Sequence, residues 1–185
     1  MVDGIVLAGG FSSRAKTNKM ILLYKDKELI LHTIETMHSV CDKIIVVTGH
    51  YHSDMVSLLS GYNFIQIVYN ENYELGMFSS IKKGVSKTQN DFFIIPGDAP
   101  KVLKSTYSEI LSIKEGIVVP SYNMRLGHPI FFKKKFKEEI LNTNHNNLKD
   151  FRNAHDFYIL ETQDSGILLD IDDLNDYNKL IGKDW

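Results

Sequence analysis

The sequence predicts an α/β fold with a mostly parallel, twisted sheet flanked by helices, and three observations support this expectation. Short apolar runs alternate with helical patterns along the chain, which is typical of βαβ units. The run Lys43–Thr48 is rich in β-branched residues, as expected of a strand buried on both faces. The 185 residues contain no repeat and no linker, so we expect a single domain over residues 1–185.

The predicted elements follow one another in a regular order. Strands are expected at Val2–Ala8, Lys43–Thr48, Phe64–Tyr69, Asp91–Ile95, Gly116–Pro120 and Leu126–Phe132, with two late strands at Phe157–Leu160 and Ile167–Ile171. Helices are expected around Ile30, Ile34 and Met37, around Met55, Leu58 and Leu59, and over Gly76–Lys87, Lys104–Ile113, Lys133–Leu141 and Leu174–Ile181. The polar run Asn142–Asn147 is expected to be a surface loop.

The composition excludes several classes of function. A net charge of −2 gives no support to nucleic-acid or membrane-surface binding. The single cysteine, Cys41, excludes an intrachain disulfide and a zinc cluster built from cysteines. Neither a signal peptide nor a membrane span is recognisable, so we expect a cytoplasmic protein.

The first predicted strand runs into a segment that is suited to phosphate binding. Gly9 and Gly10 end the apolar run, and both let the backbone approach a ligand closely. Their N–H groups can point at phosphate oxygens, while Arg14 and Lys19 supply cations for the same ligand. A glycine pair after a strand is by itself most often only a turn. The spacing of the two cations, together with motifs farther along the chain, favours a triphosphate cradle.

Two groups of carboxylates are candidate metal ligands. Asp98 follows the strand Asp91–Ile95 and stands between two prolines and a glycine. Since Mg²⁺ commonly binds one or two carboxylates plus substrate phosphates, Asp98 is the leading candidate. Asp170 and Asp172 alternate along an extended segment, so either could join it. The alternatives are that Asp98 stabilises a tight turn and that Asp172 or Asp173 caps the following helix.

Two further positions have a functional and a structural interpretation. Ser79 and Ser80, near the start of a predicted helix, either bind a base or sugar or cap that helix. His128 precedes Pro129, which favours extended geometry at the histidine. His128 therefore either faces an acceptor substrate or shapes a turn.

Five short motifs occur in one order along the chain: Leu7–Arg14 with Lys19, Gly76–Gly84, Gly97–Pro100, Gly127–Pro129 and Asp170–Asp172. The same motifs occur in the same order in the molybdenum cofactor nucleotidyltransferases, and the chain resembles that family from its first strand to its last helix. The resemblance implies a Rossmann-like nucleotidyltransferase fold and an Mg²⁺-dependent enzyme. It implies catalytic roles for Arg14, Lys19 and Asp98, Mg²⁺ binding by Asp98 with Asp170 or Asp172, and acceptor binding by His128. The nucleotide-binding residues that it implies are Leu7, Ala8, Gly9, Gly10, Ser12, Arg14, Lys19, Asn70, Gly76, Ser79, Ser80 and Asp98.

That family has a branch that uses GTP and a branch that uses CTP. The doublet Gly9-Gly10 resembles the GTP branch, whereas residues 76–80 and the run Asp170–Asp172 resemble the CTP branch. Because residues 76–80 are expected near the base, CTP is preferred. The chain also departs from the family pattern, with Lys16 in place of a usual glycine and Asp173–Asp176 in place of a usual Thr-Pro-Glu-Asp.

The resemblance implies transfer of CMP from CTP to the terminal phosphate of molybdopterin, with release of pyrophosphate. The attacking phosphate is anionic near neutral pH, so positioning and charge neutralisation replace a strong general base. A recipient molybdoenzyme would be a further partner. Three alternatives stay open: a GTP-dependent guanylyltransferase, a transferase acting on a sugar or polyol phosphate, and a molybdenum cofactor carrier without catalysis.

Overall fold

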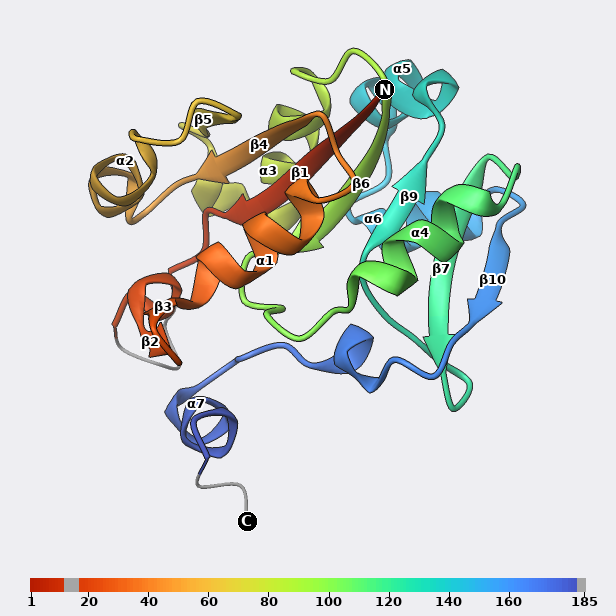
Figure 1. Cartoon of the computed structure of the whole chain (residues 1–185). Helices are drawn as coiled ribbons and strands as arrows, with labels where there is room; N and C mark the ends of the chain where they lie inside the picture. Colours follow the sequence, from red (N-terminus) through yellow and green to blue (C-terminus); the bar gives the residue numbers. More distant parts are fainter. Residues whose placement is uncertain (12–16, 183–185) are drawn as a thin grey trace.

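The computed structural model describes residues 1–11 and 17–182, and its centre is an eight-stranded sheet (Figure 1). The strand order is β10-β7-β9-β6-β1-β4-β5, with β8 paired to β7. Every pairing on the β6-β1-β4-β5 side is parallel, while β9 runs antiparallel to both of its neighbours. The sheet strands are β1 Val2–Ala8, β4 Lys43–Thr48, β5 Ile65–Tyr69, β6 Asp91–Pro96, β7 Ile117–Tyr122, β8 Arg125–Leu126, β9 Ile130–Phe132 and β10 Tyr158–Glu161. The prediction of a mostly parallel α/β fold is confirmed.

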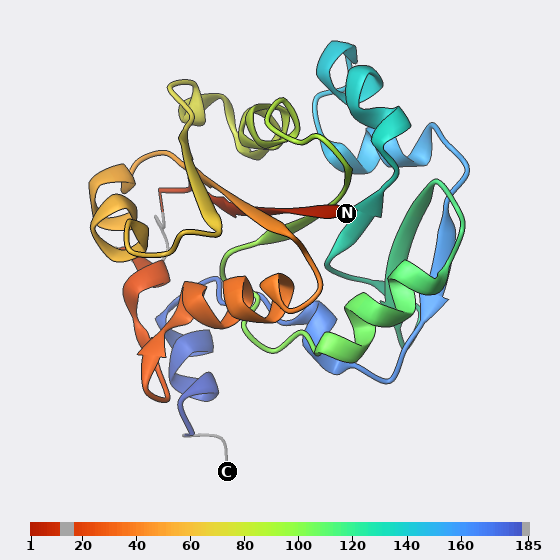
Figure 2. The ribbon, with the colours of Figure 1, turned by 45° about the horizontal axis from the view of Figure 1, so that its top comes forward.

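Helices cover both faces of the sheet, as Figure 2 shows. Alternate residues of β1 explain this, because Val6 belongs to one buried cluster and Ile5 to the other. The helices that contribute to the Val6 cluster are α1 Leu29–His38, α2 His52–Leu59 and α4 Lys104–Ser112. Those that contribute to the Ile5 cluster are α3 Met77–Val85, α5 Lys137–Asn142 and α6 Leu148–Asn153.

The structure corrects two predicted elements and adds a helix that was not predicted. The expected strand Leu126–Phe132 is split into β8 and β9 by Gly127-His128-Pro129, where the His128–Pro129 peptide is cis and Pro129 has no N–H for a ladder bond. The expected strand Ile167–Ile171 is wrong, since Ser165–Leu168 forms the 3₁₀ helix η4, capped by the Asp164 carboxylate. The polar loop ends at Asn147, which caps the unpredicted helix α6.

Short elements complete the chain. A small hairpin of β2 and β3 precedes α1 and is separate from the main sheet. The described segments include β2 Leu23–Tyr24, β3 Lys27–Glu28, η1 Lys19–Ile21, η2 Tyr73–Leu75 and η3 Lys134–Phe136. None of the helices described is long and apolar enough to cross a membrane.

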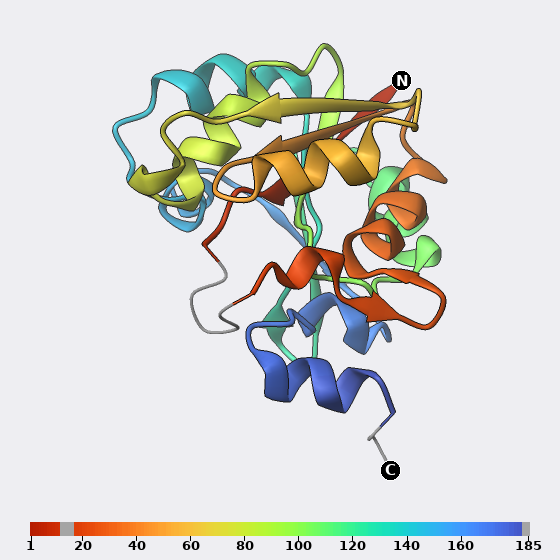
Figure 3. The ribbon, with the colours of Figure 1, turned by 90° about the vertical axis from the view of Figure 1, so that its left-hand side faces the viewer.

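The C-terminal segment returns to the N-terminal hairpin, as Figure 3 shows. Helix α7 Leu174–Leu180 follows an extended stretch, and its Tyr177 hydroxyl donates to the Leu23 carbonyl at 2.6 Å. Leu29, Ile171 and Leu180 form a small buried cluster between these parts. This packing holds the stretch that contains Asp170 beside the carboxyl ends of β1 and β6.

Candidate active site

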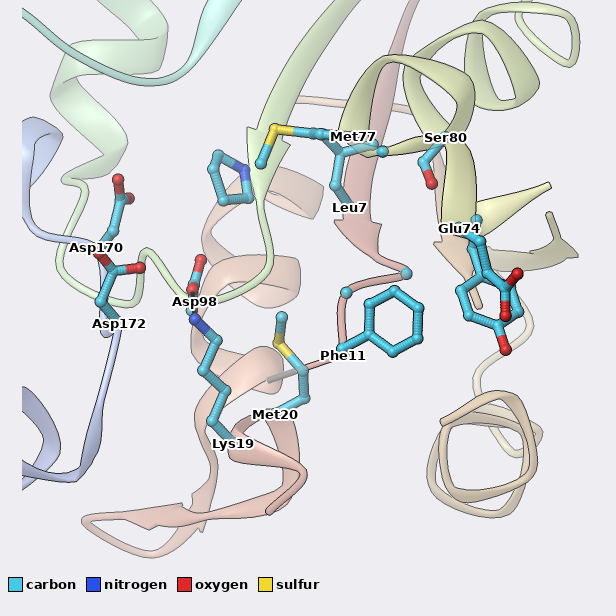
Figure 4. A pocket seen from close by; sticks show the side chains of 15 residues that line it. Leu7, Phe11, Lys19, Met20, Glu74, Met77, Ser80, Asp98, Asp170 and Asp172 are labelled. Atoms are coloured by element: carbon cyan, nitrogen blue, oxygen red, sulfur yellow. Dashed lines mark ion pairs between the residues drawn. The ribbon is translucent and has the colours of Figure 1, made fainter. Parts of the chain in front are cut away.

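A pocket of about 350 Å³ lies where β1 and β6 end, which is the edge at which parallel α/β sheets bind ligands (Figure 4). Its walls come from the ends of β1 and β6, the starts of η1 and α3, and the stretch before α7. Predicted site residues that line it are Leu7, Gly9, Gly10, Lys19, Gly76, Ser80, Asp98 and Asp170, and Asp172 lines it as well. The structure thus brings together segments that are far apart in the sequence.

The two glycines of the turn after β1 differ in their surroundings. A Cβ at Gly9 would lie 2.9 Å from the Ser80 hydroxyl, because this backbone packs closely on the start of α3. A Cβ at Gly10 would meet no atom of the described residues within 4 Å, and Gly10 lines the pocket. Gly9 therefore meets a packing requirement, whereas Gly10 leaves room for a ligand beside the backbone.

Lys19 and Asp98 form a largely buried ion pair at one end of the pocket, which we call the charged end. Their side chains are 12% and 8% exposed, and the Lys19 ammonium also donates to the Ile171 carbonyl at 2.6 Å. The Gly97 N–H donates to the Leu7 carbonyl at 2.9 Å, which ties the tip of β6 to β1. The ammonium therefore connects η1, β6 and the C-terminal stretch.

Asp170 supplies a second carboxylate beside this pair. Its Oδ1 is buried and accepts no hydrogen bond from the described residues. Burial, followed by the negative charges of Asp98 and Asp172, raises the pKa of Asp170 from its ordinary 3.8 to about 6, although Lys19 opposes the shift. A carboxylate in such surroundings gains from a nearby cation.

The donor set suits a hard divalent cation that keeps other ligands. Among the described residues no group of three acidic, histidine or cysteine side chains is arranged to hold a metal. Mg²⁺ usually binds through one or two carboxylates and completes its shell with water and substrate phosphates. The neighbouring carboxylates Asp98 and Asp170, one of them with an unpartnered oxygen, fit that mode.

Ser79, Ser80 and Asn70 form a hydrogen-bonded unit at the start of α3. The Asn70 amide donates to the Ser79 hydroxyl at 2.9 Å and to the Ser80 hydroxyl at 3.0 Å. Of the three, only Ser80 lines the pocket. Gly76 precedes them with a φ of +94°, a conformation that favours glycine. Asn70 and Ser79 thus position the wall, whereas Ala8 is buried in the cluster that contains Val6.

His128 lies outside the pocket wall but within electrostatic reach of Asp98. Its backbone N–H donates to the Ile167 carbonyl at 2.9 Å, and its Nδ1 is buried without a partner among the described residues. Burial lowers the pKa of His128 to about 4, with Asp98 opposing and Arg152 adding to the shift. The imidazole is therefore neutral at physiological pH, so one ring nitrogen can donate a hydrogen bond and the other can accept one.

Several lining residues were missed from the sequence. They are Phe11, Met20, Tyr73, Glu74, Met77 and Pro96, and most are apolar or aromatic. Phe11 directly follows the glycine pair, and Tyr73 and Glu74 precede Gly76, so proximity to the motifs was the available signal. The predicted residues Ser12 and Arg14 lie outside the described residues.

The sequence of the chain is similar to the sequences of known proteins. A family model for the MobA-like NTP transferase domain matches residues 4–158. The chain is 29% identical over 179 residues to the molybdenum cofactor cytidylyltransferase of Escherichia coli (strain K12), covering 95% of this chain and 93% of that protein. It is 28% identical over 180 residues to a protein of Natranaerobius thermophilus named "Probable molybdenum cofactor guanylyltransferase", covering 89% and 82%.

The fold also matches a solved structure. A nucleotidyl transferase from Methanothermobacter thermautotroptrophicus superposes with a TM-score of 0.84 at 20% identity, covering 99% of this chain and 97% of the other. At this identity the likeness concerns the fold alone.

Proposed function

The chain belongs to the family of MobA-like NTP transferase domains, and from this premise we propose that it transfers CMP from CTP to the terminal phosphate of a molybdopterin cofactor. The observation that carries the proposal is the shared pocket of the glycine turn, Lys19 and the Asp98 tip of β6. A glycine turn suits phosphates, and a rigid carboxylate beside it suits their counter-ion. In this proposal residues 1–185 act as one domain.

CTP is proposed as the nucleotide because two observations favour it. The Escherichia coli relative, at 29% identity, is named a cytidylyltransferase. Residues 76–80, which resemble the CTP branch, contribute Gly76, Met77 and Ser80 to the pocket. GTP is the second candidate, supported by the Gly9-Gly10 doublet and by the Natranaerobius relative at 28% identity.

The residues of the charged end would have different roles in the reaction. An oxygen of the acceptor phosphate attacks the α-phosphorus of CTP, a P–O–P link forms, and the bond to the leaving pyrophosphate breaks. Lys19 would hold the phosphates and offset charge on the leaving group, together with Arg14. Asp98 and Asp170 would hold Mg²⁺, which when bound polarises phosphoryl oxygens and neutralises developing charge.

His128 is proposed to face the acceptor. Its unpartnered Nδ1 leaves a hydrogen-bonding capacity that a substrate oxygen or N–H could satisfy. The charge of Arg152 acts on His128, and the residue is largely buried; its guanidinium donates to Asn153 and lies 4.9 Å from the centre of the Phe157 ring. A buried cation beside a neutral histidine suits an anionic acceptor such as a molybdopterin phosphate.

Pyrophosphate release tests the proposal directly. The protein would be supplied with Mg²⁺, molybdopterin and each of CTP, GTP, UTP and ATP in turn. We expect release that requires the acceptor and is fastest with CTP. Faster release with GTP would make the protein a guanylyltransferase, and release only with a sugar or polyol phosphate would change the acceptor. Retained pterin binding without release from any nucleotide would indicate a carrier.

A further inference from the structure

The pocket has two chemically different ends. Figure 4 shows Lys19, Asp98 and Asp170 on one side and Phe11 and Glu74 on the other. The first side carries the cation and carboxylates that suit phosphates and a divalent ion. The second side is largely aromatic, and the glycine turn of β1 lies between the two. A ligand that spans the pocket therefore needs a charged part and a flat apolar part, as a nucleoside triphosphate has.

The aromatic end is built by three rings from different segments. The Phe11 ring lies 5.3 Å from the Tyr73 ring at a 58° tilt and 5.2 Å from the His50 ring at a 42° tilt. The Tyr73 and His50 rings are 6.1 Å apart. Phe11 is nevertheless 44% exposed and lines the pocket. A large aromatic residue held in place by other rings, yet open to the pocket, offers a stacking surface.

Glu74 adds a hydrogen-bond acceptor to the aromatic end of the pocket. It lines the pocket next to Tyr73 in the 3₁₀ helix η2, and its side chain is exposed. An ionised carboxylate accepts hydrogen bonds and cannot donate them. It can therefore accept a hydrogen bond from an exocyclic amino group such as that of cytosine, whereas it would repel the carbonyl oxygen that uracil carries at the same position.

We propose that the Phe11 ring, held in place by Tyr73 and His50, is the stacking surface for the nucleobase and that Glu74 accepts a hydrogen bond from its exocyclic amino group, so that this end selects CTP over UTP. The proposal rests on the proposed nucleotidyltransferase function and adds the residues that choose the base. The Phe11 ring has neither a charge nor a hydrogen-bond donor for a phosphate, and the Glu74 charge repels phosphates from this end. The triphosphate is thereby oriented with its phosphates toward Lys19 and Asp98.

Equilibrium binding of CTP, UTP and inorganic tripolyphosphate, each with Mg²⁺, tests the proposal without requiring turnover. For F11A we expect CTP affinity to fall about tenfold, since base stacking on one aromatic ring is worth about 5- to 150-fold. For E74Q we expect the preference for CTP over UTP to fall at least about fivefold, because the amide can donate to uracil. Tripolyphosphate has no base, so its affinity should not fall in either variant.

E71Q is the matched control. Glu71 is a neighbouring exposed carboxylate that pairs with Lys83 at 2.7 Å and does not line the pocket. The E71Q substitution removes the same charge from the same segment as E74Q does, so the ratio of CTP to UTP affinity should stay at the wild-type value. Unchanged tripolyphosphate binding shows that each variant retains the charged end and the fold around it.

The outcomes separate this proposal from the function on which it rests. Wild-type protein that binds no nucleotide would contradict the proposed function itself. Strong CTP binding that neither F11A nor E74Q alters would overturn the base-reading assignment and leave the function standing. A loss of molybdopterin binding in F11A with unchanged CTP binding would overturn it too, since the rings would then serve the acceptor.

Discussion

The substitution Asp170→Asn should make the metal-free protein more stable at neutral pH, although it removes a candidate metal ligand. The Asp170 carboxyl has a buried oxygen without a hydrogen-bond partner among residues 1–11 and 17–182, and two carboxylates lie nearby. Its pKa of about 6 in the folded chain compares with 3.8 as its ordinary value. In the window between these values the folded state keeps a proton that the unfolded state has lost. The stability that this proton provides is complete below 3.8 and is lost as pH rises through about 6.

The difference of about two pKa units corresponds to roughly 3 kcal/mol of unfolding free energy at neutral pH. The side chain is partly exposed, so screening by solvent lowers the expected effect to about 1–3 kcal/mol. Asparagine has the same shape and no charge, so it avoids the penalty. For a chain of 185 residues the melting temperature should rise by about 2–4 °C per kcal/mol.

Urea unfolding at a series of pH values, in the presence of a metal chelator, measures this effect. The two stability curves should converge toward the acid end of the window and separate as pH rises through it. Asp156→Asn, which neutralises an exposed carboxylate outside the pocket, is the control and should show no such separation. An Asp170→Asn variant that is equally stable or less stable than wild type at neutral pH would refute the reasoning.

Three further predictions concern the charged end and the glycine turn. Lys19→Met leaves the largely buried Asp98 carboxylate without its ion pair and should cost about 3–5 kcal/mol in urea unfolding; a cost under about 1 kcal/mol would mean that the pair is dispensable. Gly10→Ala should leave stability within about 0.5 kcal/mol and raise the KM for nucleotide, while Gly9→Ala should lower the melting temperature because its Cβ would crowd the Ser80 hydroxyl. Asp98→Ala should abolish pyrophosphate release, and near-normal release by that variant would reject its proposed role.

Most of the sheet could be predicted from the sequence because its strands are continuous apolar runs. β1 and β4 have the expected bounds, and β6 differs only by Pro96. The glycine turn and the tip of β6 follow these strands directly. Since the carboxyl ends of neighbouring parallel strands meet at one edge, their proximity in the pocket follows from the strand order.

The remainder depended on contacts between distant segments. The stretch after Asp164 alternates like a strand, but the Asp164 carboxylate accepts from Gly166 N–H, Leu103 N–H and the Thr106 hydroxyl and winds it into η4. The aromatic end of the pocket was missed because ring contacts such as that of Phe11 with Tyr73 span many residues. Periodicity and turn chemistry report local structure, so neither signals such contacts.

A crystal structure of the complex with CTP and Mg²⁺ tests the central claim most directly. We expect a triphosphate against the backbone of Gly9 and Gly10, with the divalent ion on the Asp98 carboxylate. A nucleotide bound elsewhere on the molecule, or a divalent ion held by residues other than Asp98, would contradict it.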